Sequence, residues 1–244
     1  MEFRHELIKT SDLTEATIIN LEKIFNSAFE SNENYQSHFQ WKYCSNPMGD
    51  SRHLLSYADD QLVGVRSFWR LFEDQDLLQC VDTSVAHNVQ KLGVFKSGTE
   101  FLLKHNIKMY NFPNSKSLRQ YSKYGWVIRQ KFKSSLTTFR SAMDHCVNFD
   151  TTENFLSWRY TCHPKFKYKK YRKGLYNYIF RMKKSIPILL FKTLTDIELP
   201  TIKPIFCVVY SNIPGVSIAF GDLTYAISRD STLFDLNPYL MDML

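Results

Sequence analysis

The most constraining feature of the chain is a tight turn in which residues 85–95 read V-A-H-N-V-Q-K-L-G-V-F. The pattern predicts the end of a strand, a turn, and a helix over residues 94–105. A turn of this kind directs unpaired N–H groups into one concave space, with the positive end of the helix dipole behind them. Gly93 allows close approach of the backbone, so the turn is suited to hold a pyrophosphate.

A second motif follows at residues 114–126, which read N-S-K-S-L-R-Q-Y-S-K-Y-G-W. Asn114 comes after Pro113 and can cap a short helix, Tyr121 lies within that helix, and Gly125 ends it before the next strand.

Together the two motifs resemble the GNAT acyltransferase superfamily, whose signatures are V-x-P-x-x-[QR]-x-x-G-x-[GA] and N-x6-Y-x3-G-[FW]. The second signature matches at every marker position. The first departs at His87, where proline is usual, and at Phe95, where a final glycine or alanine is usual. The resemblance covers roughly residues 1–140. It implies an α/β fold with a mixed, splayed central sheet flanked by helices.

The other elements expected within residues 1–140 follow one another as in the fold that the resemblance implies. Asp59-Asp60 is a hairpin signal between two apolar segments. Strands are expected at residues 3–9, 53–58, 62–69, 77–85, 108–112 and 126–132, and the first two helices at residues 13–25 and 35–43.

A short aromatic motif occurs twice. Residues 41–47 read W-K-Y-C-S-N-P and residues 158–164 read W-R-Y-T-C-H-P, each preceded by a phenylalanine at Phe39 or Phe155. We interpret this as a degenerate internal repeat, with chance similarity as the alternative. The second copy lacks the phosphate turn and the tyrosine helix. We therefore expect a catalytic domain at residues 1–140 and a smaller GNAT-like half at residues 141–244 that walls the acceptor side.

The resemblance implies that an acyl-CoA thioester lies along residues 82–85 and that an amine attacks its carbonyl directly. Backbone groups of Thr83 and Val85, with Ser84 between them, are expected to hold the acyl carbonyl and the pantetheine arm. The other expected coenzyme contacts are Gln90, Lys91, Leu92, Gly93, Val94, Phe95 and Asn114.

Two side chains are candidates for the chemistry. Tyr121 is the expected acid, because a phenol with a pKa of about 10 is protonated at neutral pH and need only hydrogen-bond the departing sulfur. Asp82 can accept a proton from the attacking amine, or it can be a structural hydrogen-bond acceptor. His87 fits a structural role, and His38 and His163 beside the aromatic motifs stay open. No metal is expected.

Composition narrows the class of protein. The net charge of +7 favours anionic partners such as coenzyme A. The five cysteines are widely spaced and never form C-x-x-C, which argues against a disulfide framework or a zinc site. The N-terminus lacks a signal-peptide core and the apolar runs are too short to span a bilayer, so we expect a cytoplasmic protein.

The whole layout resembles the sugar N-acyltransferases of bacterial surface-polysaccharide pathways, such as those of lipopolysaccharide O-antigen. This implies transfer of an acetyl or short hydroxyacyl group to the amine of a nucleotide-linked amino sugar, with dTDP as the expected nucleotide, by a monomer or homodimer. A cationic, aromatic run at residues 165–184 suits a diphosphate and a base. The alternatives are a peptide or polyamine acceptor, and a non-catalytic module that binds nucleic acid through its basic second half.

Overall fold

The computed structural model describes residues 1–29, 35–70, 77–113, 115–149, 151–211, 216–217 and 224–228. Asn114, one of the expected coenzyme contacts, lies outside the described residues.

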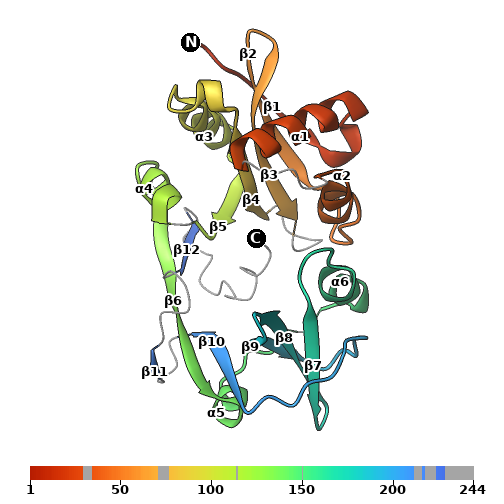
Figure 1. Cartoon of the computed structure of the whole chain (residues 1–244). Coiled ribbons are helices and arrows are strands. Elements are labelled where there is room, and N and C mark those ends of the chain that lie inside the picture. Colours follow the sequence, from red (N-terminus) through yellow and green to blue (C-terminus); the bar gives the residue numbers. More distant parts are fainter. Residues whose placement is uncertain are drawn as a thin grey trace.

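The first half of the chain is built on an antiparallel meander followed by one parallel strand (Figure 1). Asp59 and Asp60 both have positive φ, 46° and 61°, as the tight turn between two of these strands requires. The parallel strand needs a crossover, and a helix supplies it. The strands are β1 (Arg4–Lys9), β2 (Arg52–Ala58), β3 (Gln61–Arg70), β4 (Leu77–Val85) and the parallel β5 (Lys108–Asn111).

Helices cover both faces of this sheet. Leu55 of β2 packs in one core cluster with Leu21 and Phe25, whereas its neighbour Leu54 packs in another with Leu102 and Tyr121. Side chains alternate along a strand, so the two clusters lie on opposite faces. One face carries α1 (Glu15–Phe29), α2 (Tyr35–Phe39) and the π-helical turn η2 (Gln40–Cys44), and the other carries α3 (Val94–Lys104) and α4 (Ser115–Ser122).

The second half repeats this arrangement without the crossover helix. Both copies of the aromatic motif form a π-helical turn after a short α-helix. In each half, three antiparallel strands then lead to a fourth that is parallel to the third. The elements are α6 (Glu153–Leu156), η4 (Ser157–Thr161), β7 (Tyr168–Lys173), β8 (Tyr176–Lys183), β9 (Ile186–Thr193) and β10 (Phe206–Ser211).

The two halves exchange strands at the centre of the sheet. The order β2-β3-β4-β5-β12-β6-β10-β9-β8-β7 is the same arrangement from either end, with β1 added beside β2. Thus β6 (Val127–Thr138) pairs with β10 of the second half, and β12 (Thr224–Ser228) pairs with β5 of the first. The domain boundary at residue 140 stays a prediction, since strands cross it in both directions. The remaining elements are α5 (Phe139–Asp144), β11 (Val216–Ser217), and the 3-10 turns η1 (Thr10–Asp12) and η3 (His87–Val89).

The sequence predictions for the fold class and most elements are confirmed. The chain is a mixed α/β protein, and β4 occupies the residues expected of it. The strand expected to end at residue 132 continues to Thr138, because β10 supplies a second partner for its final residues. Within the described part of the chain, no helix is long and apolar enough to cross a bilayer.

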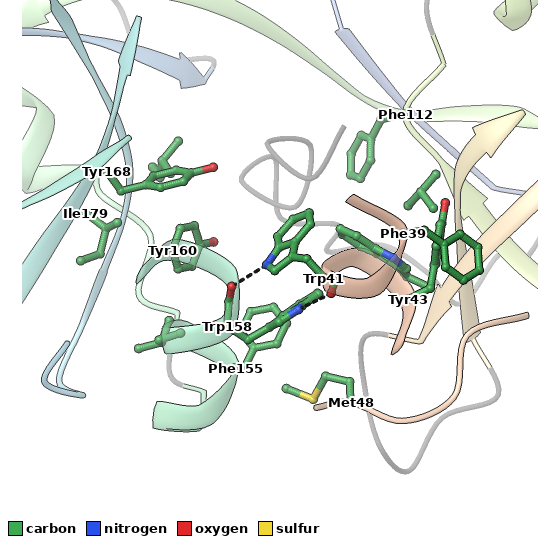
Figure 2. Packing of buried hydrophobic residues seen from close by; sticks show 14 of the residues in the cluster. Phe39, Trp41, Tyr43, Met48, Phe112, Phe155, Trp158, Tyr160, Tyr168 and Ile179 are labelled. Atoms are coloured by element: carbon green, nitrogen blue, oxygen red, sulfur yellow. Dashed lines mark hydrogen bonds between the residues drawn. The ribbon is translucent and has the colours of Figure 1, made fainter. Parts of the chain in front are cut away.

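A pair of tryptophans joins the two halves (Figure 2). The indole N–H of Trp41 donates to the carbonyl oxygen of Trp158 at 2.9 Å, and that of Trp158 donates to the carbonyl oxygen of Trp41 at 2.8 Å. The two rings are stacked, with centroids 5.4 Å apart. This reciprocal contact relates the two motif copies by an approximate twofold axis.

Trp158→Phe should destabilise the protein more than Trp126→Phe. The two side chains are similarly buried, at 6% and 5% exposed, but the indole N–H of Trp126 has no hydrogen-bond partner among the described residues. Only the first substitution leaves a buried carbonyl unpaired, which costs about 1–3 kcal/mol beyond the loss of packing. Urea unfolding of both variants measures the difference, and equal losses would show that the reciprocal hydrogen bonds contribute little.

Candidate active site

The site begins where β4 and β5 separate. Their pairing runs from Leu77 and Lys108 to Cys80 and Asn111, after which β4 continues alone on this side to Val85. Among the described residues no strand covers this edge of β4. The fork confirms the expected splayed sheet. Its open edge can pair with an extended ligand as an added strand would.

A β-bulge lies at the mouth of the fork. Ser67 of β3 is opposite Asp82 and Phe68 is opposite Cys80, so Val81 is an extra residue in β4. The bulge allows the consecutive side chains of Val81 and Asp82 to reach the α1 and α2 face. Bulges commonly re-aim side chains next to active sites.

Backbone groups beyond the bulge point into the fork. The N–H of Ala86 donates to the carbonyl oxygen of Val63, which fixes the alternation of the β3–β4 ladder. It follows that Thr83 and Val85 direct their N–H and C=O groups away from β3. The carbonyl of Val85 accepts from the side chain of Gln90 at 3.2 Å, in agreement with this direction. Ser84 between them is buried, and its hydroxyl has no hydrogen-bond partner within the part of the chain that the structure describes.

The phosphate turn has a left-handed backbone at two positions. Gly93 has φ of 102° and Lys91 has φ of 67°. Gly93 is the N-terminal cap of α3 and no side chain caps the helix, so the first N–H groups of α3 are left for a ligand. A Cβ on Gly93 would meet no atom within 4 Å, so the backbone angle rather than space requires glycine.

The other expected turn residues take different positions. Gln90 is exposed, and its side-chain amide links the turn to the end of β4 through its hydrogen bond to the Val85 carbonyl. Leu92 is 51% exposed, whereas Val94 is buried against the backbone at Gly64. Phe95, the departure from the family signature, packs its ring at 5.5 Å from that of Tyr121. Its bulk therefore fills core below the turn, and its N–H stays at the helix terminus.

Tyr121 lies at the apex of the fork on the α3 and α4 face. It is 2% exposed, and its hydroxyl donates to Sγ of Cys80 at 3.5 Å. Burial, with the nearby Cys80, raises the pKa of Tyr121 well above its ordinary range, so the phenol holds its proton. The geometry shows a phenol already directed at a sulfur atom beside the last paired residues of β4 and β5.

Asp82 lies on the opposite face and is held by two residues of the first aromatic motif. Nζ of Lys42 is 2.8 Å from Oδ2 of Asp82, and the hydroxyl of Tyr43 donates to the same oxygen. Burial opposes ionisation, but Lys42 and Tyr43 together hold the pKa of Asp82 below its usual value. This carboxylate is therefore a weaker base than an ordinary aspartate.

Sequence reasoning missed both partners of Asp82. Lys42 is only 4% exposed, and a buried lysine needs an acid nearby. The repeated W-K-Y motif carried that signal, but nothing in the sequence linked it to a strand forty residues later.

A buried polar chain extends from this pair. Ser67, the partner of Asp82 in the ladder, bonds Nδ1 of His53 at 2.9 Å, and Nε2 of His53 bonds Thr10 at 2.9 Å. Burial lowers the pKa of His53 to about 4, so this histidine is neutral at physiological pH. It belongs to the scaffold under the bulge.

His87, for which the sequence predicts a structural role, and the two histidines that the sequence leaves open, His38 and His163, have distinct surroundings. His87 is exposed on η3. The ring of His38 lies 5.6 Å from that of Trp41. His163 lies 4.3 Å from the Trp41 ring and accepts the N–H groups of Lys165 and Phe166, and burial with nearby Arg159 lowers its pKa to about 3. His163 is thus a neutral residue that closes the turn after η4.

Asp82→Asn should lower stability by about 3 kcal/mol at neutral pH, because it leaves buried Lys42 without its counter-charge. The folded-state pKa of Asp82 is depressed, so its contribution is present above the usual aspartate pKa of about 4 and is lost as pH falls through the lower folded value. The difference in unfolding free energy between wild type and variant should therefore disappear in acid. Urea unfolding between neutral and acidic pH measures it.

Asp196→Asn is the matched control. Asp196 pairs with Lys170 at 3.1 Å and also has a lowered pKa, but its side chain is 72% exposed. Its removal should change stability little. The assigned ion pair would be contradicted if Asp82→Asn lost as little stability as Asp196→Asn. It would also be contradicted if the stability loss of Asp82→Asn did not change in acid.

Comparison with known proteins gives likenesses in structure alone. No family model and no curated protein matches the chain. Escherichia coli ElaA is 14% identical, with a TM-score of 0.43 over 54% of this chain and 91% of its own. An acyl-CoA N-acyltransferase from Pseudomonas aeruginosa is 16% identical, with a TM-score of 0.42 over 54% and 90%. The PaiA N-acetyltransferase from Thermoplasma acidophilum, in complex with coenzyme A, is 14% identical, with a TM-score of 0.37 over 52% and 91%. Similarity of this degree assigns no chemistry to this chain.

Proposed function

We propose that this protein is a coenzyme A-dependent N-acyltransferase. The observation that carries the proposal is the fork between β4 and β5, which has the phosphate turn at its open end and Tyr121 at its apex. A pantetheine arm is an extended chain with amide groups, so it can pair with the edge of β4 while its pyrophosphate binds the start of α3.

The two faces of the sheet divide the chemistry. With the thioester in the fork, the acceptor amine approaches from the face of Asp82 and attacks the acyl carbon. Backbone groups of Thr83 or Val85 stabilise the oxyanion. The nitrogen loses its extra proton to water. The C–S bond then breaks, its electron pair remains on sulfur, and Tyr121 on the other face donates a hydrogen bond to that thiolate, which takes its proton from water.

The depressed pKa of Asp82 limits which acceptor amines can react. A carboxylate with a depressed pKa attracts the positive charge that develops on nitrogen, but it takes up a proton poorly. The acceptor amine must then be substantially neutral when it arrives. A sugar amine is less basic than a lysine amine with a pKa of about 10.4, because neighbouring oxygens withdraw electron density.

The low basicity of a sugar amine and the cationic hairpin of β7 and β8 both support a nucleotide-linked amino sugar as acceptor. We take dTDP as the first nucleotide to test. Lys169 and Lys170 of β7 are half-buried, Arg172 and Lys173 are exposed, and the guanidinium of Arg181 lies 3.7 Å from the Phe166 ring centroid. Such a surface can bind a diphosphate and stack a base. The donor we propose is acetyl-CoA or a short hydroxyacyl-CoA, used in the cytoplasm.

The deciding experiment measures thiol release from acetyl-CoA and hydroxybutyryl-CoA with dTDP-linked and UDP-linked amino sugars. Lysine peptides and spermidine are assayed beside them. We expect release with a sugar nucleotide. Release with peptides or spermidine alone would keep the enzyme class and overturn the acceptor. No release and no coenzyme A binding, together with salt-sensitive binding of nucleic acid, would overturn the enzyme class.

Gly93→Val should abolish coenzyme A binding without unfolding the protein. A β-branched residue is strained at this φ of 102°, so the turn must change shape and its N–H groups lose their common direction. We expect no measurable coenzyme A binding by this variant in isothermal titration.

Gly174→Val controls for the strain itself. Gly174 also has positive φ, 60°, with open space around its Cβ, but it lies in the turn between β7 and β8. Both variants should lose similar stability, whereas only Gly93→Val should lose coenzyme A. Normal binding by Gly93→Val would refute the phosphate turn.

A further inference from the structure

A buried arginine lies beside the fork without an acidic partner. Arg66 of β3 is 4% exposed, and its side chain is directed at α3. One terminal nitrogen donates to the hydroxyl of Thr99 at 3.1 Å and to the carbonyl of Phe95 at 3.5 Å. Its Nε has no hydrogen-bond partner, and among the described residues no carboxylate lies within ion-pair distance of the guanidinium.

Such a charge is costly in a protein interior. A buried cation normally has a counter-ion, because two neutral hydrogen bonds replace only part of the lost hydration. The guanidinium carbon also lies 4.1 Å from the centroid of the Phe95 ring, and this contact offsets a further part of the lost hydration free energy. The remaining positive field is available to any negative charge nearby.

The neighbours of Arg66 show which groups its positive charge acts on. Its partner in the ladder is Thr83, whose hydroxyl is 3.7 Å from Sγ of Cys80. The ring of Tyr121 lies 6.0 Å from the guanidinium carbon. Arg66 also opposes the rise in the pKa of both Cys80 and Tyr121. A small cavity beside it is lined by Ser56, Thr83, Phe95 and Gly98, among other residues.

We propose that Arg66 is the electrostatic partner of the coenzyme A thiolate, lowering the energy of the negative sulfur at the fork apex. The inference rests on the proposed function, since it places the coenzyme sulfur beside Tyr121. As the C–S bond breaks, the electron pair stays on sulfur, the Tyr121 hydroxyl donates a hydrogen bond to that sulfur, and the proton that the amine nitrogen loses goes to water. Arg66 gains no bond and loses none. It acts on the reaction through its charge, as a positioning residue.

The test measures the acidity of the bound coenzyme thiol. Thiolate absorbs in the ultraviolet, and the protein loaded with coenzyme A is titrated against the same protein loaded with desulfo-coenzyme A, which cancels the protein's own cysteines and tyrosines. We expect the bound thiol of the wild type to have a lower pKa than free coenzyme A. Arg66→Met should raise that pKa by about one unit, and Arg66→Lys, which keeps the charge, should restore most of the difference.

Turnover gives a second readout. Arg66→Met should lower kcat by about tenfold to a hundredfold while changing KM for the acyl donor little, because the charge matters after the C–S bond begins to break. Arg4→Met is the matched control. The guanidinium carbon of Arg4 also lies over an aromatic ring, 4.2 Å from the centroid of Tyr57, but the side chain is 57% exposed on β1. It should leave both the thiol pKa and kcat unchanged.

The outcomes separate this inference from the proposed function. Tight coenzyme A binding with a thiol as weakly acidic as in solution would overturn the role of Arg66 and leave the acyltransferase proposal standing. Equal thiol acidity in the Met and Lys variants would do the same. No binding of coenzyme A to the wild type would overturn both. If Arg66→Met fails to fold, the Arg66→Lys variant and the wild type are still compared, and an unshifted thiol pKa in the wild type would still overturn the inference.

Discussion

The reciprocal hydrogen bonds between Trp41 and Trp158 are the contact on which the rest of the structure depends. They fix one π-helical turn against the other, and the first of these turns also carries Lys42 and Tyr43. The residues that hold Asp82 are therefore positioned from the interface between the halves. The face of the sheet that carries Asp82 and the packing of the second half are therefore parts of one arrangement.

Within the first half, one extra residue in β4 has a large effect. Val81 shifts the ladder so that Asp82 reaches the α1 and α2 face, while Cys80 and Thr83 keep to the side of α3. The bulge thus places an acid and a phenol on opposite sides of one strand. A regular strand would not bring two consecutive side chains, Val81 and Asp82, to the same face.

The local features of the fold could be predicted because short-range chemistry determines them. Gly93, Gly125 and the Asp59-Asp60 pair mark turns by their backbone requirements, and all four residues have positive φ. The bulge could not be predicted, since residues 77–85 are mostly buried and give no alternation from which an extra residue could be read. The Lys42–Asp82 pair and the isolation of Arg66 depend on contacts between distant segments, which the spacing of residues along the chain does not encode. The roles of Tyr121, Asp82 and the turn residues remain predictions.

The exchange of β6 and β12 also bears on how the chain acquires its structure. In the described part of the chain, the second neighbour of β5 (residues 108–111) is β12 (residues 224–228), so a central strand of the sheet pairs with a segment more than a hundred residues downstream. Contacts of such long sequence separation slow folding. During synthesis this edge of β5 stays uncovered until residues 224–228 have left the ribosome. In that interval another nascent copy can take the place of β12, so this exchange makes the protein susceptible to domain-swapped aggregation.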